Sequence, residues 1–152
     1  MKVDNAILFY HEEDGDFEFT NYYEREIVVD GQTWKSVEHY YQAQKTLDEN
    51  YQQLVRAAAT PDDAKALGNS PECVVRPDWD THKLMTMRKA LFAKFTQHED
   101  LHKLLLDTGD CMLHENSWRD SYWGVGPTKD GLSMLGKCLM ALREELRYFE
   151  KN

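Results

Sequence analysis

A glutamate and a lysine seven residues apart are the first side chains in this chain that could do chemistry. Glu38 and Lys45 fall on one face of a helix predicted over residues 37–57, because seven residues nearly complete two helical turns. Tyr41, Gln42 and Glu49 share that face. In a cleft, the carboxylate and the amine would shift each other's pKa values and could exchange protons with a substrate. The same spacing also fits a solvated face whose two charges meet only water.

A short segment rich in aromatic residues and glycine is the second candidate. Residues 115–126 contain two carboxylates, three aromatic rings and two glycines in a predicted loop. An aromatic face can stack on a heterocycle, a carboxylate can stabilise an oxocarbenium-like transition state, and glycine lets the backbone approach a ligand closely. The alternative is a structural loop in which Trp123 fills the core. The candidate ligand contacts are Glu115, Ser117, Trp123 and Gly124, and Asp120 is a candidate catalytic carboxylate.

Helices are expected to position both segments. A strand is predicted over 7–10, a hairpin at Asp30-Gly31, a strand over 111–114, and further helices over 78–97, 99–107 and 133–149. A short helix begins at Thr60-Pro61, and Gly68 is expected to stop it. The predicted core stripe of the helix over 37–57 is Tyr40, Ala43, Leu47, Tyr51 and Leu54. The class is therefore α+β: one predominantly helical domain over 1–152 with a small N-terminal β-hairpin or sheet.

Composition restricts the partners. The formal net charge of −9 disfavours a protein that mainly grips nucleic acid, although one local cationic pocket could bind a phosphorylated metabolite. The three scattered cysteines, the absence of a signal-peptide pattern and the lack of a long apolar run indicate a cytoplasmic protein without a membrane segment. The His98-Glu99-x-x-His102 pattern is that of a zinc protease, but it opens a predicted helix and has no evident third ligand. We therefore expect no metal and no cofactor.

The two segments, taken with the rest of the chain, resemble the NADAR (YbiA-like) family. The similarity begins at Phe9-Tyr10 and Asn21-Tyr22 and continues through Glu38-His39-Tyr40-Tyr41-Gln42-Ala43-Gln44-Lys45. Trp79, Met87, Lys94 and Phe95 resemble the central helix of that family. Glu115, Ser117, Asp120, Trp123, Gly124 and Gly126 fit its loop, and Leu135-Gly136 with 139–146 fits its final helix. The match runs in order from about residue 7 to residue 147. Two departures, Asn69 in place of a basic residue and Ser133 in place of asparagine, are expected to alter phosphate or ribose contacts.

The resemblance implies an N-glycosidase that cuts between ribose C1 and nitrogen. One kind in this family releases ribose 5-phosphate from pyrimidine intermediates of riboflavin biosynthesis, and another removes ADP-ribose from guanine, including in nucleic acid. A third reading is a module that binds ADP-ribose or nucleotides without turnover. The oligomeric state stays open. The implied catalytic residues are Glu38, Lys45 and Asp120, and the implied substrate contacts are Phe9, Tyr10, Asn21, Tyr41, Gln42, Arg88, Glu115, Ser117, Trp123 and Gly124.

Two mechanisms fit these residues. In the first, Lys45 attacks C1 of a ring-opened ribose as an amine and forms a Schiff base, Glu38 carries the proton, and Asp120 holds the ribose hydroxyls or activates water. In the second, a carboxylate activates water directly against an oxocarbenium-like centre. Both require that Glu38, Lys45 and the segment over 115–126 face one cavity. Arg88, Lys94 and Arg119 are candidate phosphate contacts, and His114 beside Glu115 is a secondary acid–base candidate.

Overall fold

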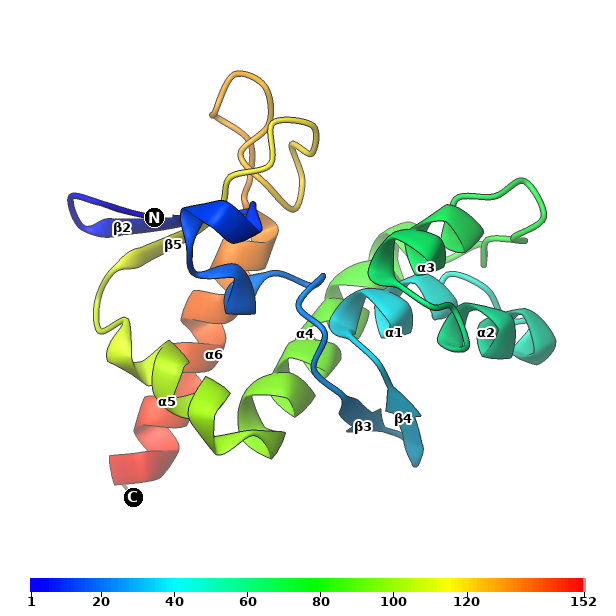
Figure 1. Ribbon diagram of the computed structural model, residues 1–152, viewed down its shortest axis with the longest axis horizontal. Coiled ribbons are helices and arrows are strands. Elements are labelled where there is room, and N and C mark those ends of the chain that lie inside the picture. The colour runs from blue at the N-terminus through cyan, green and yellow to red at the C-terminus, as the bar shows by residue number, and fades with distance from the viewer. Residues whose placement is uncertain (152) are drawn as a thin grey trace. The chain divides into compact units, whose positions relative to one another are not determined.

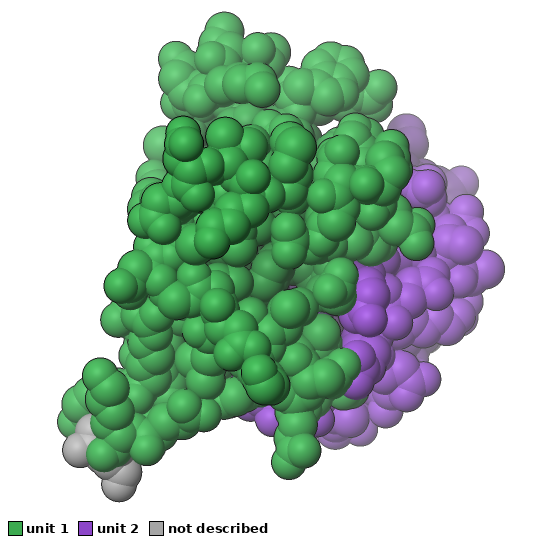
Figure 2. All heavy atoms as spheres, turned by 60° about the vertical axis from the view of Figure 1, so that its left-hand side comes forward, with its two compact units in different colours: residues 1–20, 98–152 green, residues 21–97 purple. Residues whose placement is uncertain are grey.

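The computed structural model describes residues 1–151, which form two compact units (Figure 2). Unit 1 contains residues 1–20 together with the chain from His98 onward, and unit 2 contains residues 21–97. Within the described residues there are six α-helices and two small sheets, as the α+β prediction requires. None of the helices in residues 1–151 is both long and apolar enough to cross a membrane.

A three-stranded sheet and two helices make up most of unit 1 (Figure 1). Strand β2 (Ala6–Phe9) pairs antiparallel with β1 (Lys2–Val3) and parallel with β5 (Met112–Glu115), which places Phe9 opposite Glu115. Two 3₁₀ turns follow β2, at Glu12–Asp14 and Phe17–Phe19. Helix α5 (Glu99–Asp107) precedes β5, and α6 (Met134–Lys151) closes the chain. A Cβ on Gly136 would overlap the Leu113 carbonyl, so glycine is what lets α6 pack directly on β5.

Unit 2 is built around a short helix that is buried on every side. The hairpin of β3 (Ile27–Val29) and β4 (Gln32–Trp34) turns at Asp30 and Gly31, whose φ angles of 51° and 80° confirm the predicted turn chemistry. Helix α1 (Val37–Ala43) then packs against α2 (Glu49–Arg56), α3 (Pro61–Gly68) and α4 (Trp79–Gln97). Every residue of α1 is buried, so this helix has no solvated face.

The predicted helix over 37–57 is wrong, because the chain forms α1 and α2 with a break between them. Thr46 leaves the helix to form an antiparallel bridge with Val75, and the Arg76 amide donates to the Lys45 carbonyl at 2.7 Å. Asp48 then caps α2 by accepting from the amides of residues 50 and 51. The predicted core stripe fails beyond the break, and Leu47 and Leu54 are exposed.

The remaining helices follow their sequence patterns more closely. On α4, Met87, Leu91 and Phe95 are buried, as the predicted stripe requires, and Leu84 is half-buried. Leu135, Leu139, Leu142 and Leu146 of α6 are buried, whereas Phe149 at its end is exposed. The capping residues are also as expected: Ser36 Oγ accepts from the His39 amide, and Thr60 Oγ1 from the Asp63 amide.

Candidate functional site

Glu38 and Gln42 form a buried, hydrogen-bonded pair on α1. Their side chains are 6% and 3% exposed, and Gln42 Nε2 donates to Glu38 Oε1 at 2.7 Å. A carboxylate removed from water in this way is costly unless hydrogen bonds replace the lost solvation. The solvated-face interpretation is therefore wrong at these two positions. Exposed Glu49 belongs to α2 and does not share this face.

Lys45 lies just beyond α1 and is held on both sides of its backbone. Its amide donates to the Gln42 carbonyl, and its carbonyl accepts from Arg76. The half-buried side chain donates from Nζ to Asn69 Oδ1 at 2.9 Å. Burial lowers the pKa of the Lys45 ammonium, the charges of Glu38 and Cys73 partly oppose this, and the Lys65 ammonium lowers the pKa further. A larger fraction of neutral amine, which is the nucleophilic form, follows from this environment.

Aromatic rings and a thiol surround the lysine. Tyr41 is buried, its ring centre lies 6.0 Å from Lys45 Nζ, and it meets the Trp79 ring edge-on at 5.1 Å. Burial raises the pKa of the Cys73 thiol, and the Lys45 charge opposes that rise. The sequence did not single out Cys73 and Lys65 as site residues, because each lies on a segment far from Lys45 in the chain. Asn69 was noted there only as a departure from the family pattern, not as a partner of Lys45.

Asn21 is joined to α1 through its backbone. Its carbonyl accepts from the Glu38 amide at 3.1 Å, and its side chain is buried. Among residues 1–151, Asn21 Oδ1 has no hydrogen-bond partner. A buried acceptor without a donor is uncommon in a folded protein.

In unit 1, the segment over 115–126 folds tightly against residues 131–135. The amides of Gly131, Ser133 and Leu135 donate to the carbonyls of Val125, Gly124 and Trp123, respectively. Gly124 has no room for a Cβ, which would lie 2.9 Å from both the Asp120 carbonyl and the Ser117 Cβ. Glycine and the buried Ser117 therefore serve the fold of this segment, and their predicted substrate contacts stay predictions.

Asp120 organises the turn that carries Trp123. Its Oδ1 accepts from the amides of Tyr122 and Trp123 at 2.9 and 2.8 Å. Trp123 is 9% exposed, and its ring packs edge-on against Tyr122 at 4.7 Å. The geometry therefore gives Asp120 a local structural task, and the burial of Trp123 agrees with a ring that packs inside the fold. The catalytic role of Asp120 stays a prediction.

Glu115, at the end of β5, is the second candidate site carboxylate in unit 1 besides Asp120. The Glu115 amide donates to Ser133 Oγ at 3.3 Å, and its carbonyl accepts from Val125. The half-buried His114 has no partner for its buried Nδ1 among residues 1–151. Ser133, at the position where the family resemblance suggests asparagine, thus takes part in fixing Glu115 and adopts a φ of 46°.

The remaining residues that were predicted to contact the substrate or its phosphate lie either in the core or on the surface. Phe9 is fully buried and packs against Phe19, so it offers no surface to a ligand, whereas Tyr10 is half-buried. Arg88 is exposed on α4. Lys94 is 1% exposed and lies 5.5 Å from the Tyr23 ring centre, which makes it a core residue. Arg119 stacks on the exposed Trp118 at 4.6 Å.

The residues described contain no cluster of three or more histidine, cysteine, aspartate or glutamate side chains that could hold a metal ion. His98 precedes α5 as its N-cap, and His102 Nε2 lies 3.0 Å from Glu150 Oε1. This pairing accounts for His102 without invoking zinc.

Comparison with known proteins agrees with the family resemblance. A family model described as the NADAR domain matches residues 8–147. The chain belongs to the NADAR family. N-glycosidase YbiA of Shigella flexneri is 44% identical over 143 residues, covering 94% of this chain and 89% of that protein. N-glycosidase Npun_R5314 of Nostoc punctiforme is 47% identical over 132 residues, covering 85% of each protein.

A solved structure and a relative of lower sequence identity were also compared with this chain. The NMR structure of the E. coli protein YbiA matches this NADAR chain with a TM-score of 0.90 at 41% identity, covering 100% of this chain and 90% of that one. The riboflavin biosynthesis protein VVA0006 of Vibrio vulnificus is 37% identical over 145 residues, which are 95% of this chain but 40% of that protein. The YbiA-like fold prediction is therefore confirmed.

Proposed function

We propose that this NADAR protein is an N-glycosidase that hydrolyses the bond between ribose C1 and an amine nitrogen. The observation that carries the proposal is an amine, Lys45, whose pKa is lowered by burial while the charge of the buried carboxylate Glu38 acts on it in the opposite direction. The names of N-glycosidase YbiA and N-glycosidase Npun_R5314, two of its relatives, support the reaction class. A module that only binds nucleotides would have no use for a buried acid and a nucleophilic amine that influence each other.

The amine favours a covalent route. Lys45 loses a proton to Glu38, and its Nζ attacks C1 of the ring-opened riboside. Nζ adds to C1 of the imine while Glu38 returns its proton to the substrate nitrogen. A second proton then passes from Nζ to that nitrogen, the bond from C1 to it breaks, and the amine leaves a protonated Schiff base on Lys45. Water then adds to the Schiff base, and release of the sugar aldehyde restores Lys45. The sum consumes one water and involves no oxidation or reduction.

This route restricts the substrate class. A riboside opens to a neutral imine only if its glycosidic nitrogen carries a hydrogen, as an exocyclic amine does. A ring nitrogen of an ordinary nucleoside has none, and opening would leave a charged iminium. We therefore propose a ribosylated exocyclic amine. The name of the Vibrio relative supports riboflavin biosynthesis as its source, and we propose an amino-pyrimidine intermediate of that pathway.

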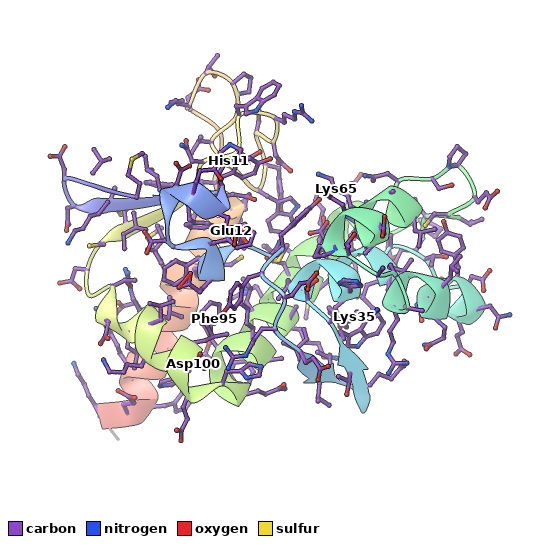
Figure 3. All side chains as sticks on the ribbon, in the orientation of Figure 1. His11, Glu12, Lys35, Lys65, Phe95 and Asp100 are labelled. Carbon is purple, nitrogen blue, oxygen red and sulfur yellow. The ribbon has the colours of Figure 1, made fainter. Side chains whose placement is uncertain are left out.

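A phosphate on that substrate would need a cation close to Lys45. Lys65 extends from α3 (Figure 3), one turn before Asn69, and its charge is the smallest of the contributions to the pKa of Lys45, which it lowers. Its Nζ also lies 6.0 Å from the Tyr22 ring centre. We propose Lys65 for the phosphate contact, since Lys94 is buried in the core.

Incubation with defined ribosides tests the function. The purified protein is given the phosphoribosylamino-pyrimidine intermediates, ADP-ribosylated guanosine, and cytidine 5′-monophosphate as a ring-nitrogen control, and release of free sugar or base is followed. We expect turnover of an exocyclic-amine riboside, loss of that turnover in Glu38→Gln, and none with the control. If no riboside is cleaved while ADP-ribose binds, a non-catalytic module is the better account.

A further inference from the structure

Gly68 occupies a position where its backbone gives no reason for glycine. It is the last residue of α3, the cap that follows is Asn69 with a φ of −97°, and Gly68 is not among the residues with positive φ. The sequence suggested a helix stop, which normally needs a left-handed glycine just beyond the helix. The predicted end of the helix at Gly68 is confirmed, but not through a left-handed glycine beyond the helix. Gly68 is itself the last helical residue, where glycine is weaker than alanine.

The side chain of Gln42 supplies the reason. A Cβ at position 68 would overlap Gln42 Oε1 and lie 2.9 Å from its Cδ and 3.0 Å from its Cβ. The missing side chain on α3 thus creates the space in which the amide of Gln42 lies. Any larger residue would push that amide along α1, toward or away from Glu38.

Burying the Gln42 amide destabilises the fold, so we expect an interaction that only this amide can make. Its Oε1 is buried without a hydrogen-bond partner among residues 1–151, and such an atom is destabilising in an apolar contact. A leucine or methionine could fill the same space without an orphaned oxygen. What only the amide provides is the Nε2 hydrogen bond to Glu38 Oε1 at 2.7 Å, which favours the ionised form of that carboxylate.

We propose that Gln42 and Gly68 are positioning residues for Glu38: Gly68 admits the amide, and the amide holds the carboxylate in place and ionised. This assignment rests on the proposed function of Glu38 as the proton carrier. It also replaces the prediction that Gln42 contacts substrate, because both ends of its amide are already enclosed by α1 and α3. Neither residue needs to touch the ribose.

A carboxylate titration tests the proposal without any substrate. The ¹³Cδ resonance of Glu38, assigned with Glu38→Gln, is followed against pH in the wild type, Gln42→Leu and Gly68→Ala. We expect the pKa of Glu38 to rise in both variants, because both remove or displace the donor. Ala66→Gly, at an exposed position of α3, is the matched control. It weakens the helix and should lower the melting temperature while leaving the titration unchanged.

Kinetics with a cleaved riboside supply the second readout. We expect kcat to fall about tenfold in Gly68→Ala with KM within about threefold, and the acidic limb of the pH profile to move upward by about one unit. Gly68→Ala combined with Gln42→Ala should be no worse than Gln42→Ala alone, since the clash partner is gone. Additive losses with an unchanged Glu38 titration would overturn the proposal. If the wild type cleaves no riboside, the proposed function fails, and the titration still decides this inference.

Discussion

Lys45 Nζ donates a hydrogen bond to Asn69 Oδ1 at 2.9 Å, which ties the candidate nucleophile to the residue that caps α3. An amide oxygen orients an ammonium without adding a charge, so it leaves the pKa of Lys45 under the control of burial. A basic residue in this place, as the family resemblance suggested, would not accept this bond. The departure at Asn69 therefore affects the lysine directly.

Replacing Asn69 with aspartate should slow the enzyme at neutral pH. The new carboxylate would lie next to the Lys45 ammonium and raise its pKa, which reduces the fraction of neutral amine. If the pKa rises by one unit, kcat/KM at pH 7 falls about tenfold and recovers at alkaline pH. The pH profile of Asn69→Asp is measured beside Asn69→Leu, which removes the acceptor without adding charge. Identical profiles for the two variants would contradict this role of Lys45.

Asp120 should tolerate loss of its charge better than loss of its oxygen. Because Oδ1 accepts from two amides of the turn, Asp120→Asn keeps an acceptor there, whereas Asp120→Ala leaves the amides of Tyr122 and Trp123 unsatisfied. We expect Asp120→Asn to keep activity within about fivefold, and Asp120→Ala to lower the free energy of unfolding by about 1–3 kcal/mol. Activity and urea denaturation are measured on both.

A different outcome would restore the catalytic assignment of Asp120. General acid–base groups contribute about 10²–10⁴ in rate. A loss of that size in Asp120→Asn, at unchanged stability, would show that the charge itself acts in the reaction.

Stability should fall in mild acid because of His39. Its ring is fully buried, Nδ1 lies 2.7 Å from Ser36 Oγ, and Nε2 lies 3.1 Å from the Ala58 carbonyl. Burial lowers the pKa of His39 below its ordinary value of 6.5, and the positive charge of Lys35 lowers it further. The hydrogen bond with the Ala58 carbonyl and the negative charges of Glu24 and Asp63 raise the pKa, but not enough to cancel the effect of burial. Below about pH 6.5, His39 therefore binds a proton in the unfolded chain but stays neutral in the folded chain until the pH reaches its lower folded pKa.

The sign and size of this effect are measurable. Above pH 6.5 both states are neutral at His39 and contribute no slope. As the pH falls from 6.5 toward the folded pKa, the free energy of unfolding decreases by up to about 1.4 kcal/mol per unit. Urea denaturation of the wild type and His39→Gln at pH 7 and 5 isolates the contribution. Parallel losses in the two proteins would show that His39 is not the cause.

Lys65→Gln should separate binding of phosphate from chemistry. If Lys65 contacts the phosphate, KM for a phosphorylated riboside rises by about tenfold while kcat changes little, because a charge-assisted contact contributes about 1.5–3 kcal/mol. The dephosphorylated riboside should show no change. Lys89→Gln on α4, whose exposed lysine pairs at the surface with Asp30, serves as the charge-matched control. Equal effects on both ribosides would remove Lys65 from the phosphate contact.

The sequence predicted correctly those elements that depend only on neighbouring residues in the chain. The Asp30-Gly31 turn and the stripe of Met87, Leu91 and Phe95 follow from positive φ and helical spacing alone. The break after α1 was not predictable in this way, because it depends on pairing between Thr46 and Val75. Periodicity also misled at α1, since a seven-residue helix enclosed on all sides has no polar face to detect.

The candidate site also combines features set by neighbouring residues with features set by residues distant in the chain. Spacing placed Glu38 and Lys45 on one face of a single long helix, whereas Lys45 lies beyond the end of α1, and their joint role stays a prediction. Gly68 and Asn69 have roles that depend on side chains more than twenty residues away, and no local signal reports them. The family resemblance named Gln42 as a substrate contact, whereas the proposal that it positions Glu38 depends on the hydrogen bond between the two side chains.

Borohydride trapping tests the central claim most directly, because only a Schiff base between protein and sugar is reduced to a stable amine. The protein is incubated with the cleaved riboside and borohydride, digested, and mapped by mass spectrometry. We predict a reduced pentose phosphate adduct on Lys45, formed only with substrate and absent in Lys45→Arg. Full turnover by the wild type without any adduct on Lys45, or undiminished turnover by Lys45→Arg, would contradict the covalent account and leave water activated by a carboxylate as the mechanism.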